Sequence, residues 1–215
     1  MHTFGIVAEG ITDQVVIKNI LYGLLGSEKL EDANFLQPMR DQTDSFGNWY
    51  NVIEYCGSER VRKDFENNDF IVIQIDTDTS EEKHFDIPKH DENNKELSVE
   101  QLIMNVFEKL KTLIINKNGI DFWEYYEQKI IFAIAVHSTE CWLLPLYATS
   151  KREMEATKNC HNRLGKLLKT SIKKEAAVYE GLSKPFMKSK ELLKVKDKNP
   201  SLRIFIENLE TQVII

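Results

Sequence analysis

The sequence predicts an α/β protein with a mainly parallel, Rossmann-like sheet flanked by helices and an all-helical C-terminal extension. Three apolar segments, at 3–8, 70–75 and 130–136, have the length and β-branched content of buried strands. Helical patterns follow each of them, and strands that alternate with helices are typical of a parallel sheet. We therefore expect residues 1–148 to form the sheet domain and residues 149–215 to form a basic helical extension packed on it.

The first third of the chain has one strong helix signal and several weak signals. Apolar residues at helical spacing run from Val15 to Leu25, after Thr12 or Asp13 as the expected N-cap and before Gly26 as the expected stop. Between residues 35 and 67 the expected elements are a strand that begins at 35–36, a polar loop at 37–49, a strand at 51–56 and a short helix at 58–67.

The second half has clearer boundaries. A polar loop at 79–97, long enough to serve as a lid or a partner contact, precedes a helix that begins at Ser98, with Gln101 at the capping-box position. The last predicted strand leads into a short helix near residues 138–145. Helical patterns then cover 160–169, 172–181, 186–195 and 200–210.

Composition narrows the expected partners and location. The net charge of −6 combines an acidic body with a basic section, residues 151–200, which holds 14 Lys and Arg against 6 acidic residues. That section is either a surface for a polyanion or a set of solvated helices. Three cysteines in no metal-binding spacing predict reduced thiols in a cytoplasmic protein. No segment has the apolar length of a membrane span, and none resembles a signal peptide.

Acidic residues follow each of the three predicted strands: Glu9 with Asp13, then Asp76 with Asp78, then Glu140. The carboxyl ends of parallel strands meet at one edge of a sheet, so we expect these side chains to lie together. Clustered carboxylates raise one another's pKa values unless a cation neutralises them. Oxygen ligands without paired His or Cys favour Mg²⁺ or Mn²⁺. An isolated Asp-x-Asp is more often a turn, so the prediction depends on the combination.

The order of these acidic segments resembles a Toprim domain. The segments that carry the resemblance are Val7-Ala8-Glu9-Gly10-Ile11-Thr12-Asp13, Ile73-Gln74-Ile75-Asp76-Thr77-Asp78 and Val136-His137-Ser138-Thr139-Glu140-Cys141-Trp142. Within that family the chain is most similar to OLD-type Toprim nucleases and to small Toprim relatives found among phage-defence genes. The resemblance covers roughly residues 3–147 and leaves the C-terminal helices outside the shared core.

The resemblance implies a nuclease in which one or two magnesium ions cleave phosphodiester bonds in DNA or RNA. Its implied metal ligands, or their immediate partners, are Glu9, Asp13, Asp76, Asp78 and Glu140. Glu9 would also serve as general acid or base, and Lys166 on a basic helix is the candidate cation for the transition state. OLD-type proteins join Toprim to an ATPase, and this chain has no GxxxxGK[ST] segment. A separate ATPase or defence protein, or a second copy of the chain, is therefore an expected partner.

Two rival hypotheses stand beside a nuclease of anti-phage defence. The first is a non-catalytic Toprim-like module that binds a partner protein or nucleic acid. The second is a glycosyltransferase whose Asp76-Thr77-Asp78 binds a nucleotide sugar, which leaves Glu9 and Asp13 without a role. His137 and Trp142, close to Glu140, are more often a structural histidine and a core residue than functional groups.

Overall fold

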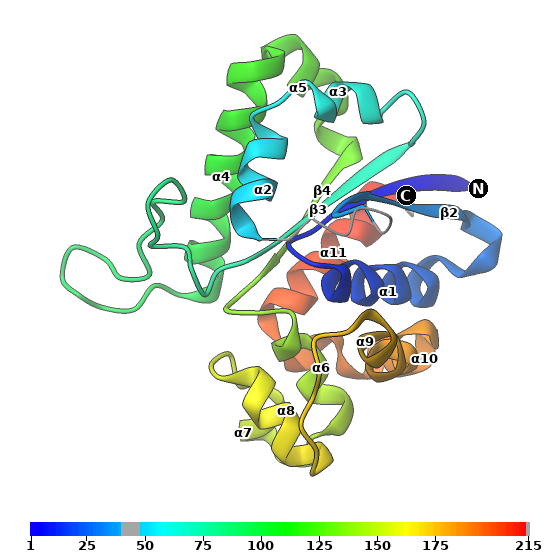
Figure 1. Cartoon of the computed structure of the whole chain (residues 1–215), viewed down its shortest axis with the longest axis vertical. Coiled ribbons are helices and arrows are strands. Elements are labelled where there is room, and N and C mark those ends of the chain that lie inside the picture. Colours follow the sequence, from blue (N-terminus) through cyan, green and yellow to red (C-terminus); the bar gives the residue numbers. More distant parts are fainter. Residues whose placement is uncertain (40–47, 214–215) are drawn as a thin grey trace.

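A computed structural model describes residues 1–39 and 48–213 of the chain (Figure 1). It contains a four-stranded, all-parallel sheet with strand order β2-β1-β3-β4. The predicted α/β class with a parallel sheet is thereby confirmed. The strands are β1 (His2–Val7), β2 (Leu30–Gln37), β3 (Phe70–Asp76) and β4 (Ile130–Ala135).

Side chains of the central strand β3 alternate between the two faces of the sheet. Phe70 and Val72 belong to one hydrophobic cluster, whereas Ile71, Ile73 and Ile75 belong to another. This alternation places Gln74 and Asp76 on the same face as Val72. The last residues of β3 pair with β4 in register, Ile75 with Ile134 and Asp76 with Ala135, so both strands end at the same edge of the sheet.

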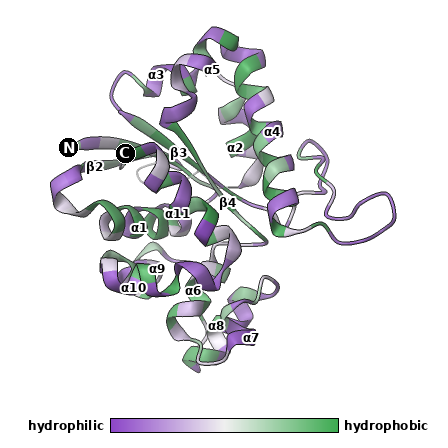
Figure 2. Ribbon diagram, turned by 180° about the vertical axis from the view of Figure 1, so that it is seen from behind, coloured by the Kyte–Doolittle hydropathy of each residue, from purple (hydrophilic) through white to green (hydrophobic). Residues whose placement is uncertain are grey.

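Helices cover both faces of the sheet (Figure 1). On the face of Ile71 lie α2 (Trp49–Cys56), α3 (Arg60–Asp64), α4 (Val99–Asn118) and α5 (Ile120–Tyr126). On the face of Val72 lie α1 (Ile11–Lys29), α6 (Glu140–Tyr147) and the helices that follow α6. Apolar residues are concentrated on the helix surfaces that face the sheet and the neighbouring helices (Figure 2).

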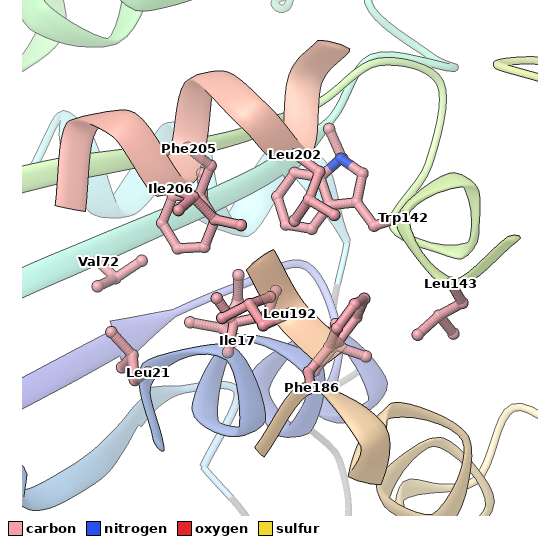
Figure 3. Close-up of a cluster of buried hydrophobic side chains, with 14 of the residues drawn as sticks. Ile17, Leu21, Val72, Trp142, Leu143, Phe186, Leu192, Leu202, Phe205 and Ile206 are labelled. Carbon is pink, nitrogen blue, oxygen red and sulfur yellow. The ribbon is translucent and has the colours of Figure 1, made fainter. Parts of the chain in front are cut away.

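The C-terminal helices share one hydrophobic core with the sheet. Ile17 of α1 lies beside Phe186, Leu192 and Phe205, while Trp142 stacks on Phe205 with ring centroids 5.5 Å apart (Figure 3). The elements after residue 148 are α7 (Lys151–Met154), α8 (Cys160–Leu168), α9 (Ala176–Ser183), η2 (Lys184–Met187), α10 (Ser189–Val195), η3 (Lys196–Lys198) and α11 (Pro200–Val213).

Close contact between α1 and the C-terminal section requires a glycine. A β-carbon at Gly23 would overlap the backbone carbonyl oxygen of Phe186. Only glycine lets the helix backbone approach another backbone this closely. The extension is therefore packed onto α1 through its main chain as well as through side chains.

Some predicted boundaries are wrong. The expected strand at 51–56 is the helix α2, because Val52, Ile53, Tyr55 and Cys56 bury one helical face and the Asn48 side chain caps the first turn through the Asn51 amide at 3.0 Å. The strand expected at 35–36 begins earlier, and α5 and the small element η1 (Glu127–Lys129) were not expected. Of the loop expected at 37–49, residues 40–47 lie outside the described residues.

The prediction of three reduced thiols is wrong for two cysteines. Cys141 of α6 and Cys160 of α8 form a disulfide, with Cα atoms 5.0 Å apart, whereas Cys56 is free and buried. Packing of α6 against α8 brings together two residues separated by 19 positions, which cysteine spacing alone does not reveal. Within residues 1–39 and 48–213, no helix combines the length and apolarity needed to cross a membrane.

Candidate metal centre

The predicted acidic residues meet at the carboxyl edge of the sheet. Glu9 follows β1, Asp76 ends β3, and the Glu9 carboxylate accepts a 2.7 Å hydrogen bond from the Asp76 backbone amide. Asp13 lies in the first turn of α1, and Glu140 begins α6. Negative charge on Asp13, Glu9, Glu140 and Asp78 acts on Asp76, so the structure does bring the five acids together electrostatically.

Asp76 is held in one orientation by three side-chain and backbone donors. Its Oδ1 accepts hydrogen bonds from Gln74 Nε2 at 2.7 Å, from the Thr139 amide at 3.2 Å and from the Thr139 hydroxyl at 3.1 Å. Within the described part of the chain, no hydrogen bond to Asp76 Oδ2 is found. One oxygen is therefore fixed by the protein, and the other remains available to a ligand.

Gln74 connects the strand ends to one another. It is fully buried in β3, its Oε1 accepts from the Glu9 amide at 3.1 Å, and its Nε2 donates to Asp76 and to the Thr139 hydroxyl at 3.1 Å. A polar side chain in an otherwise apolar strand costs free energy unless it is hydrogen-bonded. Gln74 meets that requirement by fixing the segments after β1, β3 and β4 relative to one another.

Burial raises the pKa values of the acids that follow β1 and β3. Desolvation is the largest cause for Glu9, whose pKa rises to about 8, and for Asp13, whose pKa rises to about 6. Desolvation followed by repulsion from Asp13 and Glu9 raises the pKa of Asp76 well above its ordinary value. These three carboxylates are therefore unfavourable as anions unless positive charge is added.

Glu140 is buried but well supplied with partners. Its Oε1 accepts a 2.5 Å hydrogen bond from the Tyr179 hydroxyl and lies 3.5 Å from His161 Nδ1 and 3.8 Å from Lys174 Nζ. Burial raises the pKa of Glu140, but hydrogen bonds from Tyr179 and Ser138, with the charge of Lys174, outweigh burial and lower it. The protein itself therefore stabilises the Glu140 anion.

Asp78 lies at the exposed rim of the centre. Its backbone amide donates to the His137 carbonyl oxygen at 3.1 Å, and its charge raises the pKa values of Glu9 and Asp76. His137 has a positive φ of 61° and its amide donates to the Thr77 hydroxyl at 2.8 Å. Its backbone thus shapes the turn beside the centre, as expected for a structural histidine.

By their chemistry, the donor atoms of the centre fit a hard divalent cation. Carboxylate oxygens predominate, and at least three of the acids lack enough positive charge around them. Among residues 1–39 and 48–213, no three His, Cys, Asp or Glu side chains already stand as a ready-made ligand set. The fit is therefore one of donor type and charge.

The predicted cation Lys166 lies on α8, away from the acids in sequence and exposed. It lines a polar pocket of about 430 Å³ together with His161, which contacts Glu140. No ion pair joins Lys166 to an acid in the part of the chain that the structure describes. The lysine that contacts the centre is Lys174, in the connection between α8 and α9.

Comparisons with protein-family models, with curated proteins and with solved structures find no match for this chain. Function is therefore inferred from the residues of the centre. Sequence patterns did not single out Gln74, Thr139, Lys174 or Tyr179 as members of it. Only Gln74 gave a local signal, as the one polar residue between Phe70 and Ile75.

Proposed function

We propose that this chain is a magnesium-dependent nuclease of Toprim-like fold that hydrolyses phosphodiester bonds in DNA or RNA. The observation that carries the proposal is the Asp76 carboxylate, which is fixed through Oδ1 and acted on by the charges of four other acids. A divalent cation is the group that best offsets such a concentration of negative charge. A phosphodiester is the substrate class that the resemblance to Toprim nucleases suggests.

Each acid has a distinct part in this proposal. The residues that would hold Mg²⁺ or Mn²⁺ are Glu9, Asp13, Asp76 and Asp78, with Glu140 as an immediate partner. When bound, the ion supplies Lewis-acid chemistry and lowers the pKa of water. Gln74 and Thr139 orient Asp76. Glu9, with its pKa of about 8, can take up or release a proton near neutral pH, which suits a general acid or base.

Positive charge on the substrate side comes from the C-terminal helices. Lys174 lies beside Glu140, and Lys166 lines the neighbouring pocket with His161. We assign to Lys166 and Lys174 the stabilisation of negative charge on a phosphate ester. This division agrees with the acidic body and basic section of the sequence.

The cellular setting of the proposal comes from family resemblance. It includes a role in anti-phage defence, a separate ATPase or defence protein as partner, and a homodimer. A cytoplasmic location belongs with these proposals. The disulfide between Cys141 and Cys160 removes one of its supports, because disulfides are rare in a reducing cytosol.

A nuclease assay tests the proposal directly. The full chain is incubated with plasmid, single-stranded DNA and total RNA in Mg²⁺ or Mn²⁺, beside the Asp76→Asn and Glu9→Gln variants. We expect cleavage by the wild type, its loss in EDTA, and a decrease of about 100-fold or more in both variants. The matched control is Asp121→Asn, an exposed acid on α5 that should leave cleavage unchanged. Cleavage that persists in EDTA or in both variants contradicts the proposal.

A second candidate is a non-catalytic Toprim-like module that binds a partner protein or nucleic acid. The observation that favours it is the compensation of Glu140 by Tyr179, His161 and Lys174, because this acid needs no metal to remain ionised. Purified chain that cleaves none of the three substrates, yet forms a stable complex with another chain or with nucleic acid, would decide for this candidate.

A further inference from the structure

A groove of about 610 Å³ lies among the C-terminal helices, outside the acidic centre. Lysines from three successive elements line it: Lys184 from η2, Lys188 and Lys194 at the two ends of α10, and Lys198 from η3. Glu191 is the single acidic residue of the lining. The groove is therefore strongly basic, although the chain as a whole is acidic.

Most of this charge is not used by the fold. Lys194 lies 3.8 Å from Glu191, while no ion pair is found for Lys184, Lys188 or Lys198 among the residues that the structure describes. All four lysines are exposed. Solvated lysines usually spread over a helix surface, whereas these converge on one hollow from separate elements, which indicates a site for an anion.

The rest of the lining is apolar. Pro145, Leu146 and Ala148 contribute one wall, and Pro185 and Val195 contribute another. A lysine ammonium group is a point charge well suited to phosphate, and apolar surface can contact the faces of a sugar or a base. The volume lies within the usual range for a ligand site, roughly 300–1,000 Å³. Phosphate groups attached to a nucleoside satisfy both parts of the lining.

The groove is connected to the acidic centre by two helices. α6 begins at Glu140 in the centre and ends where Leu146 lines the groove, about 9 Å along the helix axis at 1.5 Å per residue. α9 carries Tyr179, which contacts Glu140, and leads directly into Lys184. About three nucleotides of a strand cover such a distance at 3.4 Å each.

We propose that this lysine groove binds the phosphate backbone of a nucleic acid a few nucleotides from the bond at the acidic centre. The phosphate contact is a property of the groove, and its place on the same strand as the cleaved bond rests on the proposed nuclease function. Free nucleoside triphosphates share the phosphate chemistry, so the test separates the two sources.

Binding is measured with the full chain in EDTA, where no cleavage occurs, by the fluorescence anisotropy of a labelled single-stranded oligonucleotide at several salt concentrations. The groove variant is Lys184→Glu/Lys188→Glu. The control variant is Lys151→Glu/Lys190→Glu, which reverses two exposed lysines outside the groove lining. We expect the slope of log K against log salt to decrease by about 2 in the groove variant, one for each lost phosphate contact, and to decrease by less in the control.

A milder variant, Lys194→Gln/Lys198→Gln, guards against misfolding caused by charge reversal and should decrease the slope in the same direction. Equal slopes for wild type, groove variants and control overturn the proposal. Displacement of the oligonucleotide by ATP at matched phosphate concentration also overturns it, because the ligand is then a free nucleotide. Binding of polyglutamate in preference to the oligonucleotide has the same consequence and points to an acidic protein.

The two proposals can fail separately. Wild-type cleavage together with groove variants that bind like the control removes the groove alone. Groove-dependent binding in a wild type that never cleaves removes the nuclease alone and leaves the chain as a nucleic-acid-binding module.

Discussion

Asp76 and Glu140 are two buried acids of one centre, and the protein treats their charges in opposite ways. Burial and four neighbouring acids raise the pKa of Asp76 well above its ordinary value, despite donors from Gln74 and Thr139. Hydrogen bonds and a nearby lysine lower the pKa of Glu140. The difference indicates that the Glu140 side is complete without a ligand, while the Asp76 side lacks positive charge. This asymmetry is the basis of the proposed metal site.

The largest expected effect is the dependence of stability on pH and metal. Glu9 has a pKa of about 8 in the folded chain against an ordinary value of 4.5. Below pH 4.5 the group is protonated in both states and costs nothing; as pH rises to 8, only the unfolded state ionises readily, so stability decreases. A difference of one in pKa between the folded and unfolded states corresponds to about 1.4 kcal/mol, so we expect a loss of several kcal/mol in EDTA.

Thermal unfolding from pH 4.5 to pH 8, with EDTA or with Mg²⁺, measures this loss. Mg²⁺ should restore the melting temperature at pH 8, because a ligand that binds only the folded state stabilises it. The Glu9→Gln variant should melt at nearly the same temperature across the range and respond little to Mg²⁺. A wild type whose metal-free stability increases between these pH values would break the contrast between the two acids.

The next effect concerns the disulfide beside Glu140. Cys141 follows Glu140, Cys160 precedes His161, and the bond ties the helices that carry these partners. Closing a loop of 19 residues stabilises a protein by about 3 kcal/mol. We expect reduction by a phosphine to lower the free energy of unfolding by roughly that amount, measured by urea denaturation. A Cys141→Ser/Cys160→Ser variant should be insensitive to the reductant, and an equally sensitive variant would show that the effect lies elsewhere.

The smallest effect distinguishes the two acids by neutral substitution. In EDTA at pH 8, Asp76→Asn should stabilise the chain, because it removes a charge that repels its neighbours. Glu140→Gln should destabilise it by about 2 kcal/mol, because it weakens the charged hydrogen bond from Tyr179. Tyr179→Phe is the matched control and should destabilise in the same direction. Equal signs for Asp76→Asn and Glu140→Gln would show that the acids do not differ as described.

Local patterns were sufficient for the central strands and for the address of the acids. β3 and β4 are short runs of buried apolar residues, and Asp76 stands at the point where one of these runs ends. Patterns failed at α2, where a short apolar run fits both a strand and a buried helix. They also failed at the edge strand β2, whose exposed acidic residues weaken the apolar signal.

The partners of Glu140 could not be predicted from the sequence. Tyr179 lies 39 positions away along the chain, and its contact with Glu140 depends on the packing of α9. Lys174 was one of 14 basic residues in its section, without a local feature to separate it from Lys166. Long-range packing decides which lysine and which tyrosine reach the centre.

Calorimetric titration with Mg²⁺ near pH 7, in two buffers of different ionisation enthalpy, tests the metal site most directly. Because Glu9 holds a proton at that pH, binding should release protons, and the apparent enthalpy should differ between the buffers. We predict saturable binding with proton release for the wild type, no binding for Asp76→Asn and retained binding for Asp121→Asn. The absence of binding for both Mg²⁺ and Mn²⁺, or undiminished binding by Asp76→Asn, would contradict a metal centre at the carboxyl edge of this sheet.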